Sequence, residues 1–232
     1  MDTAQTYENE AEVGQARTSS GKKREEIWIT TKVRMGNYTR LADSVAKSLE
    51  KLQTEYIDLL LLHRPTDTTE HQSCFDAMKE LQTKGKIHHL GISNFTLAQM
   101  QHAWDYTKGN IFTNQVEYHL ALDQSQLKSF ADTHHFQLTA YSPLGHGHLL
   151  KEAALLPIAE KHTASVAQIC IARLLQQGCI VIPKASSEKR LQENFEAQHL
   201  VLDEEDLAII ASLPKNHRYI NPPFAPKWDE TL

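Results

Sequence analysis

The chain has 232 residues, which is enough to bury a substantial core, and its composition of 41% hydrophobic and 23% charged residues is typical of a soluble globular protein. The net charge is -5 with both signs mixed along the chain, which argues against a nucleic-acid or other polyanionic partner. Three widely spaced cysteines exclude a disulfide framework and a paired-cysteine metal site.

No apolar run approaches the length of a membrane span, and the first residues lack the apolar core of a signal peptide. The cysteine pattern fits a reducing cytoplasm. We also expect a monomer that contacts neither membrane nor nucleic acid. Histidine pairs and the "HGH" segment occur without a matching carboxylate spacing, so no metal site is expected.

Strand and helix patterns alternate along the chain. Apolar, β-branched runs predict strands, and apolar residues three or four apart predict helices. In chain order the expected strands lie at 26–33, 56–63, 87–94, 111–119, 136–143, 178–186 and 198–202. The expected helices lie at 9–17, 41–52, around 75–81, and at 97–106, 124–135, 151–177, 188–197 and 203–213. The proline-rich segment 215–232 is expected to be an irregular C-terminal tail.

Strict alternation of apolar strands with helices predicts an α/β fold with parallel pairing. Seven strands suit either an open doubly wound sheet or an eight-stranded barrel with one strand missing. The absence of a GxGxxG turn disfavours the dinucleotide-binding open sheet. An eighth strand would end at "DTAQTY", with the helix at 9–17 as its partner. We therefore predict a single-domain (β/α)8 TIM barrel over 1–232 that lacks an N-terminal hairpin and most of strand 1.

Chemically active side chains fall where the predicted strands end, and the carboxyl ends of barrel strands form the active site of this fold. Asp2 and Tyr7 follow the first strand, Lys32 ends the second and His63 ends the third. A lysine that closes an apolar strand needs a counter-charge, which Asp2 could supply. Each of these residues alone is more often structural than catalytic. Together they suit proton donation to a carbonyl oxygen, because the Lys32 ammonium would stabilise the phenolate that Tyr7 leaves after giving up its proton.

A second cluster surrounds the start of the helix at 188–197. Lys184, Ser186, Ser187 and Arg190 lie where free N–H groups and the helix dipole attract an anion. Arg190 could grip a phosphate with its planar fork. An ordinary capped surface helix is the alternative reading.

Seven segments, in order, resemble the motifs of the aldo-keto reductase family over essentially the whole chain. They are "DTAQTYENEAEVG", "ITTKV", "YIDLLLLHRP", "GISNF", "NQVEYH", "AYSPLG" and "VIPKASSEKRLQEN". Within the family the chain looks most like bacterial enzymes that reduce 2,5-diketo-gluconate and methylglyoxal. The resemblance implies NADPH-dependent reduction of aldehydes and ketones, either small α-dicarbonyls or keto-sugar acids, to alcohols.

The resemblance also implies residue roles. Tyr7 would be the proton donor, Lys32 would favour its ionisation, Asp2 would pair with Lys32, and His63 would orient the carbonyl. NADPH would contact Ser93, Asn94, Gln115, Tyr141, Ser142, Leu144, Lys184, Ser187, Arg190, Glu193 and Asn194.

Two features depart from the family pattern. Arg64 stands where the family usually has a tryptophan after the histidine, so a cation replaces an aromatic wall of the substrate pocket. The family also carries a hairpin and the body of strand 1 before the "DTA" motif. The alternative reading is therefore a catalytically impaired homologue that binds cofactor or acts as a structural protein.

Overall fold

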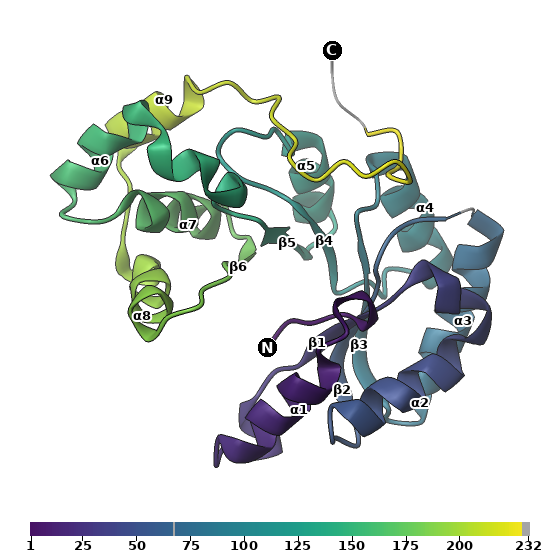
Figure 1. Ribbon diagram of the computed structural model, residues 1–232. Helices are drawn as coiled ribbons and strands as arrows, with labels where there is room; N and C mark the ends of the chain where they lie inside the picture. Colours follow the sequence, from purple (N-terminus) through teal and green to yellow (C-terminus); the bar gives the residue numbers. More distant parts are fainter. Residues whose placement is uncertain (67, 229–232) are drawn as a thin grey trace. The chain divides into compact units, whose positions relative to one another are not determined.

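The computed structural model describes residues 1–66 and 68–228, and the chain divides into two compact units, Met1–Asn114 and Gln115–Leu232. In the N-terminal unit, strands β1 (Thr30–Val33), β2 (Ile57–Leu62) and β3 (Ile87–Ser93) are parallel and lie in that order (Figure 1). The helices of this unit are α1 (Glu10–Ser19), α2 (Leu41–Lys51), α3 (Thr68–Thr83) and α4 (Leu97–Thr107). Three 3-10 turns are η1 (Gln5–Tyr7), η2 (Arg24–Glu26) and η3 (Met35–Arg40). Strand β4 (Thr113–Glu117) spans the boundary between the units.

Strands β1 and β2 do not show the alternation of polar and apolar residues that is typical of a strand with one face in solvent. Every residue of both strands is buried, as expected for strands covered on both faces. Lys32 of β1 lies opposite Leu61 of β2, so the register pairs a charged residue with an apolar one. Each fully buried leucine contributes about 1.5–3 kcal/mol to the free energy of unfolding.

The first residues extend the same sheet, as the sequence predicts. Asp2 forms a parallel bridge with Thr30, the Thr30 N–H donates to the Met1 carbonyl at 2.8 Å, and the Thr3 N–H donates to the Thr30 carbonyl at 2.8 Å. The first residues therefore pair beside β1, on the side where the sequence analysis expects strand 1.

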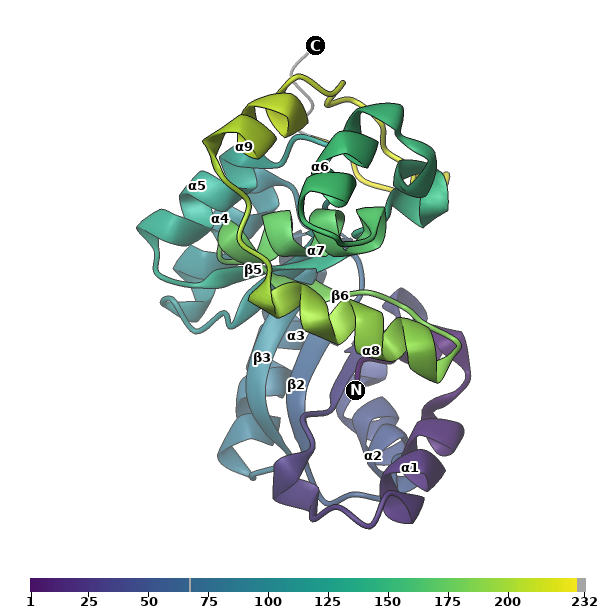
Figure 2. The same cartoon turned by 90° about the vertical axis from the view of Figure 1, so that its left-hand side faces the viewer.

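The C-terminal unit contains the parallel strands β5 (Gln137–Tyr141) and β6 (Ile180–Ile182) and a group of helices (Figure 2). These helices are α5 (Ser125–Thr133), α6 (Leu156–Lys161), α7 (Val166–Gln176), α8 (Glu188–Glu196) and α9 (Glu204–Ala211). The 3-10 turns are η4 (Gly145–Lys151), η5 (Ala153–Leu155) and η6 (Ala197–His199). Leu155, Ile169 and Cys170 are fully buried and lie in the apolar core that α6, α7 and α9 share.

The predicted strand at 198–202 is wrong. Residues Ala197–His199 form η6, and the segment that follows pairs with no strand among the described residues. The Gln176 side chain instead bonds both backbone groups of Leu202, each at 3.0 Å, while Val201 is 72% exposed. A side-chain amide thus supplies the partners that a neighbouring strand would have supplied.

The predicted long helix at 151–177 is also interrupted. Thr163 has a left-handed φ of 50°, which ends α6. The Ser165 hydroxyl accepts the Gln168 N–H, and the Gln168 side chain accepts the Ser165 N–H, so a capping box starts α7. The apolar periodicity continues through 151–177, but the left-handed residue and the capping box divide this segment into separate helices.

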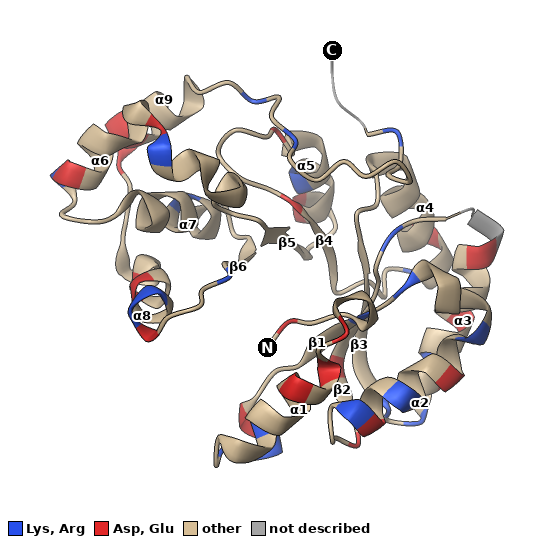
Figure 3. Cartoon of the chain, in the orientation of Figure 1, with Lys and Arg blue, Asp and Glu red and all other residues tan. Residues whose placement is uncertain are grey.

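Surface charge is mixed in both signs. Acidic and basic residues both occur along α1, α2 and α3 (Figure 3). Within the described part of the chain, no helix combines the length and apolarity that crossing a bilayer requires.

Candidate functional site

A buried ion pair lies at the start of the N-terminal unit. The Lys32 side chain is 1% exposed, and its Nζ donates to Asp2 Oδ1 at 2.5 Å and to the Thr3 carbonyl at 2.9 Å. The Asp2 carboxylate is 20% exposed, so the pair opens to solvent on the aspartate side. Removing one partner of such a pair costs about 3–5 kcal/mol, because the other charge is left buried.

Tyr7 lies over this pair. Its ring centroid is 5.1 Å from Lys32 Nζ, and the residue is 51% exposed. Its hydroxyl forms no hydrogen bond with the described residues 1–66 and 68–228. The phenol is thus close to a buried cation while its hydroxyl stays available to a ligand.

His63 completes the group. Its ring meets the Tyr7 ring edge-on at 5.6 Å, and Nδ1 lies 3.3 Å from the Thr6 hydroxyl. Burial, together with the nearby cations Lys32 and Arg64, lowers the pKa of His63 to about 3. The imidazole is therefore neutral at physiological pH and can hydrogen-bond a carbonyl without carrying a charge.

Hydrogen bonds in the turn η1 set the position of Tyr7. Gln5 donates to the Ser48 hydroxyl at 3.1 Å and accepts from Asn37 Nδ2 at 2.8 Å. The buried Glu10 accepts the Thr31 hydroxyl at 2.7 Å. The sequence reading missed Gln5, Thr6 and Glu10, because isolated polar residues in a turn give no periodic signal.

The structure brings Asp2, Tyr7, Lys32 and His63 together, and Ser93 and Asn94 lie at the neighbouring strand end. Asn94 has a left-handed φ of 63°, and its Nδ2 donates to the His63 carbonyl and to Ser93 Oγ, both at 3.0 Å. A non-glycine residue in this conformation is held by its surroundings and is common at functional sites. The amide therefore ties the end of β3 to the residue that ends β2.

The remaining expected cofactor residues lie in the C-terminal unit. Gln115 is buried in β4, Tyr141 ends β5, and Ser142 has a left-handed φ of 50°. Leu144 precedes η4. Glu193 and Asn194 lie in α8 and are partly buried.

The predicted anion site lies at the start of α8, which is a capped helix N-terminus. The Ser187 hydroxyl caps the helix by accepting the Arg190 N–H at 3.4 Å. Lys184 and Arg190 are exposed, and neither side chain pairs with an acceptor among the described residues. Two unneutralised cations and a helix N-terminus thus lie together.

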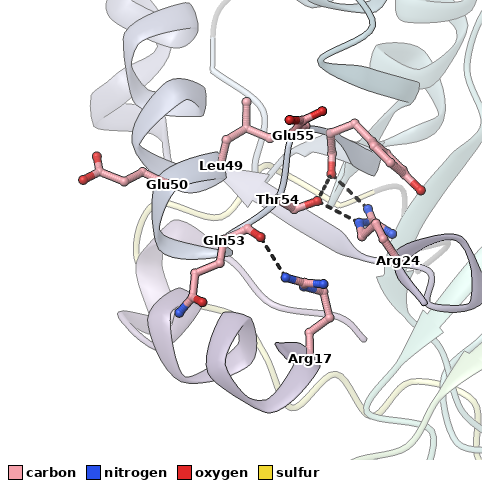
Figure 4. Close-up of a pocket in the computed structure, with 8 residues that line it drawn as sticks. Arg17, Arg24, Leu49, Glu50, Gln53, Thr54 and Glu55 are labelled. Atoms are coloured by element: carbon pink, nitrogen blue, oxygen red, sulfur yellow. Dashed lines mark hydrogen bonds between the residues drawn. The ribbon is translucent and has the colours of Figure 1, made fainter. Parts of the chain in front are cut away.

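A pocket of about 560 Å³ also lies in the N-terminal unit, but it shares no residue with the catalytic candidates (Figure 4). The Arg24 guanidinium faces it, yet its nitrogens already bond Thr54, Tyr56 and Asp58. Arg17 is held by the Gln53 carbonyl at 2.8 Å. Both lining arginines therefore already donate to protein acceptors, and the volume of the pocket does not mark it as the reaction site.

No group of three histidine, cysteine or acidic side chains is placed to hold a metal ion within residues 1–66 and 68–228. The histidine pairs have other contacts. His88 stacks on Tyr56 at 4.2 Å, and His134 stacks on Phe130 at 4.0 Å.

Comparison with known proteins decides the family. The sequence profile of the Aldo/keto reductase family matches residues 1–215. The chain belongs to this family. It is 39% identical over 235 residues to a protein from Escherichia coli O157:H7 named methylglyoxal reductase DkgB, covering 99% of this chain and 88% of that protein.

Solved structures of aldo/keto reductases match the fold. A crystal structure described as a putative 2,5-diketo-D-gluconic acid reductase B has a TM-score of 0.94 and 39% identity, covering 99% of this chain and 83% of that one. An aldo-keto reductase complexed with NADPH has a TM-score of 0.90 and 28% identity, covering 98% and 77%. The predicted family and its α/β-barrel fold class are confirmed.

The environment of His63 predicts how this aldo/keto reductase titrates. Because the folded state holds the pKa of His63 near 3, the ring should stay neutral from pH 8 to pH 5. In the unfolded chain the His63 ring takes up a proton at about pH 6.5, whereas in the folded chain it does so only near pH 3. Because the unfolded state binds this proton at the higher pH, the free energy of unfolding falls as the pH is lowered from about 6.5 toward 3. Histidine-selective ¹⁵N NMR, with the signal assigned by His63→Asn, should show no titration in that range. A midpoint near 6.5 would contradict the buried environment.

Proposed function

We propose that this chain reduces aldehydes and ketones to alcohols with NADPH, and that small α-dicarbonyls such as methylglyoxal, or keto-sugar acids, are its substrates. The observation that carries the proposal is the gathering of Asp2, Tyr7, Lys32 and His63 in the N-terminal unit. Family membership supports the reaction class, and the name of the 39% identical relative supports the dicarbonyl class. A neighbouring family structure that contains NADPH supports the cofactor.

In this proposal Tyr7 gives its hydroxyl proton to the carbonyl oxygen. Lys32 lies beneath the ring and stabilises the phenolate that remains, while Asp2 balances the lysine charge. NADPH, when bound, supplies the hydride to the carbonyl carbon. We assign neutral His63 the tautomer in which Nδ1 accepts from the Thr6 hydroxyl, so that Nε2 carries the hydrogen and can donate it to the carbonyl oxygen.

The exposed cations at α8 favour NADPH over NADH. Lys184 and Arg190 would hold the adenosine 2′-phosphate beside the capped helix N-terminus. In the N-terminal unit, Ser93 and Asn94 would hydrogen-bond the nicotinamide carboxamide. The other cofactor contacts that the resemblance implies stay predictions.

Tyr7→Phe should separate chemistry from cofactor binding. The substitution removes the proton donor and keeps the ring, so kcat with methylglyoxal should fall about 10²- to 10⁴-fold. The NADPH dissociation constant, measured by fluorescence titration, should stay within about twofold.

Tyr56→Phe is the matched control, because Tyr56 also lies in the N-terminal unit and its hydroxyl has no protein partner among the described residues. Full activity in Tyr7→Phe would rule out the assigned acid. NADPH binding without turnover in the unmodified protein would favour a non-catalytic, cofactor-binding role.

Arg64 should set a preference for anionic carbonyl substrates. It directly follows His63, and its charge is close enough to contribute to the low pKa of that residue. Arg64→Trp should lower the ratio of kcat/KM for succinic semialdehyde over butyraldehyde by about tenfold, the equivalent of roughly 1.4 kcal/mol. An unchanged ratio would remove Arg64 from substrate selection.

A further inference from the structure

A second cavity, of about 190 Å³, lies in the C-terminal unit and shares no residue with the expected catalytic or cofactor site. Its wall is formed by the segment after β4, by α7, by α9 and by Lys215. Because a water molecule occupies about 30 Å³ in the liquid, the cavity has room for about six water volumes. It is therefore suited to a small ligand.

Arg173 is the feature that singles out this cavity. Its side chain lines the wall and is half-buried, yet its guanidinium donates no hydrogen bond and forms no ion pair with any described residue. A half-buried guanidinium without an acceptor leaves five donors unsatisfied by the protein. Such a group is suited to bind an anion with its planar fork.

Two further donors face the same space. Tyr118 is 6% exposed, and its hydroxyl accepts from Gln177 Nε2 at 3.0 Å, so the O–H hydrogen remains to be donated. Lys215 Nζ donates to the carbonyls of Leu120 and Ile210 at 2.6 and 2.7 Å, which accounts for two of its three hydrogens.

The electrostatics of the cavity also favour an anion. Burial lowers the pKa of Lys215, and the nearby Arg173 lowers it further because the two like charges repel, while the nearby Asp123 carboxylate raises it. Asp123 is the acidic residue on the wall, and its carboxylate already accepts the Ser125 N–H at 2.8 Å and the Ser125 hydroxyl at 3.1 Å. An anion bound at Arg173 would relieve the repulsion between the two cations.

Part of the cavity wall is apolar. Leu122 and Ile210 are 2% and 3% exposed, and Leu207 lines the cavity beside them. A bare phosphate would place charged oxygens against these apolar side chains, whereas a carboxylate that carries a short alkyl group would suit both the polar and the apolar lining residues.

We propose that this cavity binds a small carboxylate with a compact apolar group, held by Arg173 and Tyr118 at its charged end and by Ile210 and Leu207 at its alkyl end. The site is separate from the proposed reductase chemistry, and its occupation can be measured without turnover.

The probe is isobutyrate, with isobutyramide as its uncharged isostere and inorganic phosphate as the non-alkyl anion. In ¹H–¹⁵N NMR titrations of the full chain at constant ionic strength, isobutyrate should shift the Arg173 Nε–H signal saturably, with a Kd in the millimolar range. Isobutyramide should cause no saturable shift, and phosphate should bind more weakly than isobutyrate.

Arg173→Gln should weaken isobutyrate binding at least tenfold, as judged from backbone signals of α7 and α9, and Tyr118→Phe should weaken it about fivefold. Tyr118→Phe keeps the buried ring, so it tests the site even if Arg173→Gln fails to fold. Arg40→Gln, which removes an exposed arginine from the N-terminal unit, is the matched control and should bind as the unmodified protein does.

Three outcomes would overturn the proposal. The first is the absence of saturable binding up to about 100 mM isobutyrate. The second is equal affinity in Tyr118→Phe, Arg173→Gln and the unmodified chain. The third is tighter binding of phosphate than of isobutyrate, which would contradict the apolar part of the ligand.

Discussion

The buried pair between Lys32 and Asp2 is the interaction on which the candidate site depends. A lysine at 1% exposure within a fully buried strand must be compensated, and Asp2 supplies the charge while the Thr3 carbonyl supplies a second acceptor. Both partners come from the segment that pairs beside β1, so neutralising the lysine also fixes that segment. Tyr7 follows within one turn, and its position over the lysine is a consequence of this arrangement.

The residues that follow β2 and β3 complete the candidate site around this ion pair. Burial, with smaller contributions from Lys32 and Arg64, lowers the pKa of His63 and keeps it neutral, and Asn94 donates to the His63 carbonyl from the end of the next strand. The result is a phenol next to a cation and an uncharged imidazole, which is a suitable set for protonating a carbonyl oxygen. For His63, burial matters as much as residue identity, because burial is the largest cause of its lowered pKa.

Much of this arrangement could be predicted from the sequence. Alternating apolar runs and helical periods predicted the parallel α/β fold, and a lysine that ends an apolar strand predicted its need for Asp2. The strand at 198–202 was predicted wrongly because apolar composition cannot reveal that Gln176 bonds the backbone of Leu202. The contacts of Gln5 and the cavity at Arg173 were not predicted, because they join segments that are distant in sequence and carry no periodic signal.

A double-mutant cycle on the central ion pair tests the account most directly. The kcat/KM for methylglyoxal would be measured for the unmodified chain, Asp2→Asn, Lys32→Met and the double variant, with circular dichroism to verify folding. If Asp2 acts through Lys32, the effects should be strongly non-additive, with a coupling of at least about tenfold, or roughly 1.4 kcal/mol. Additive effects of the two substitutions would contradict the claim that this pair organises the site.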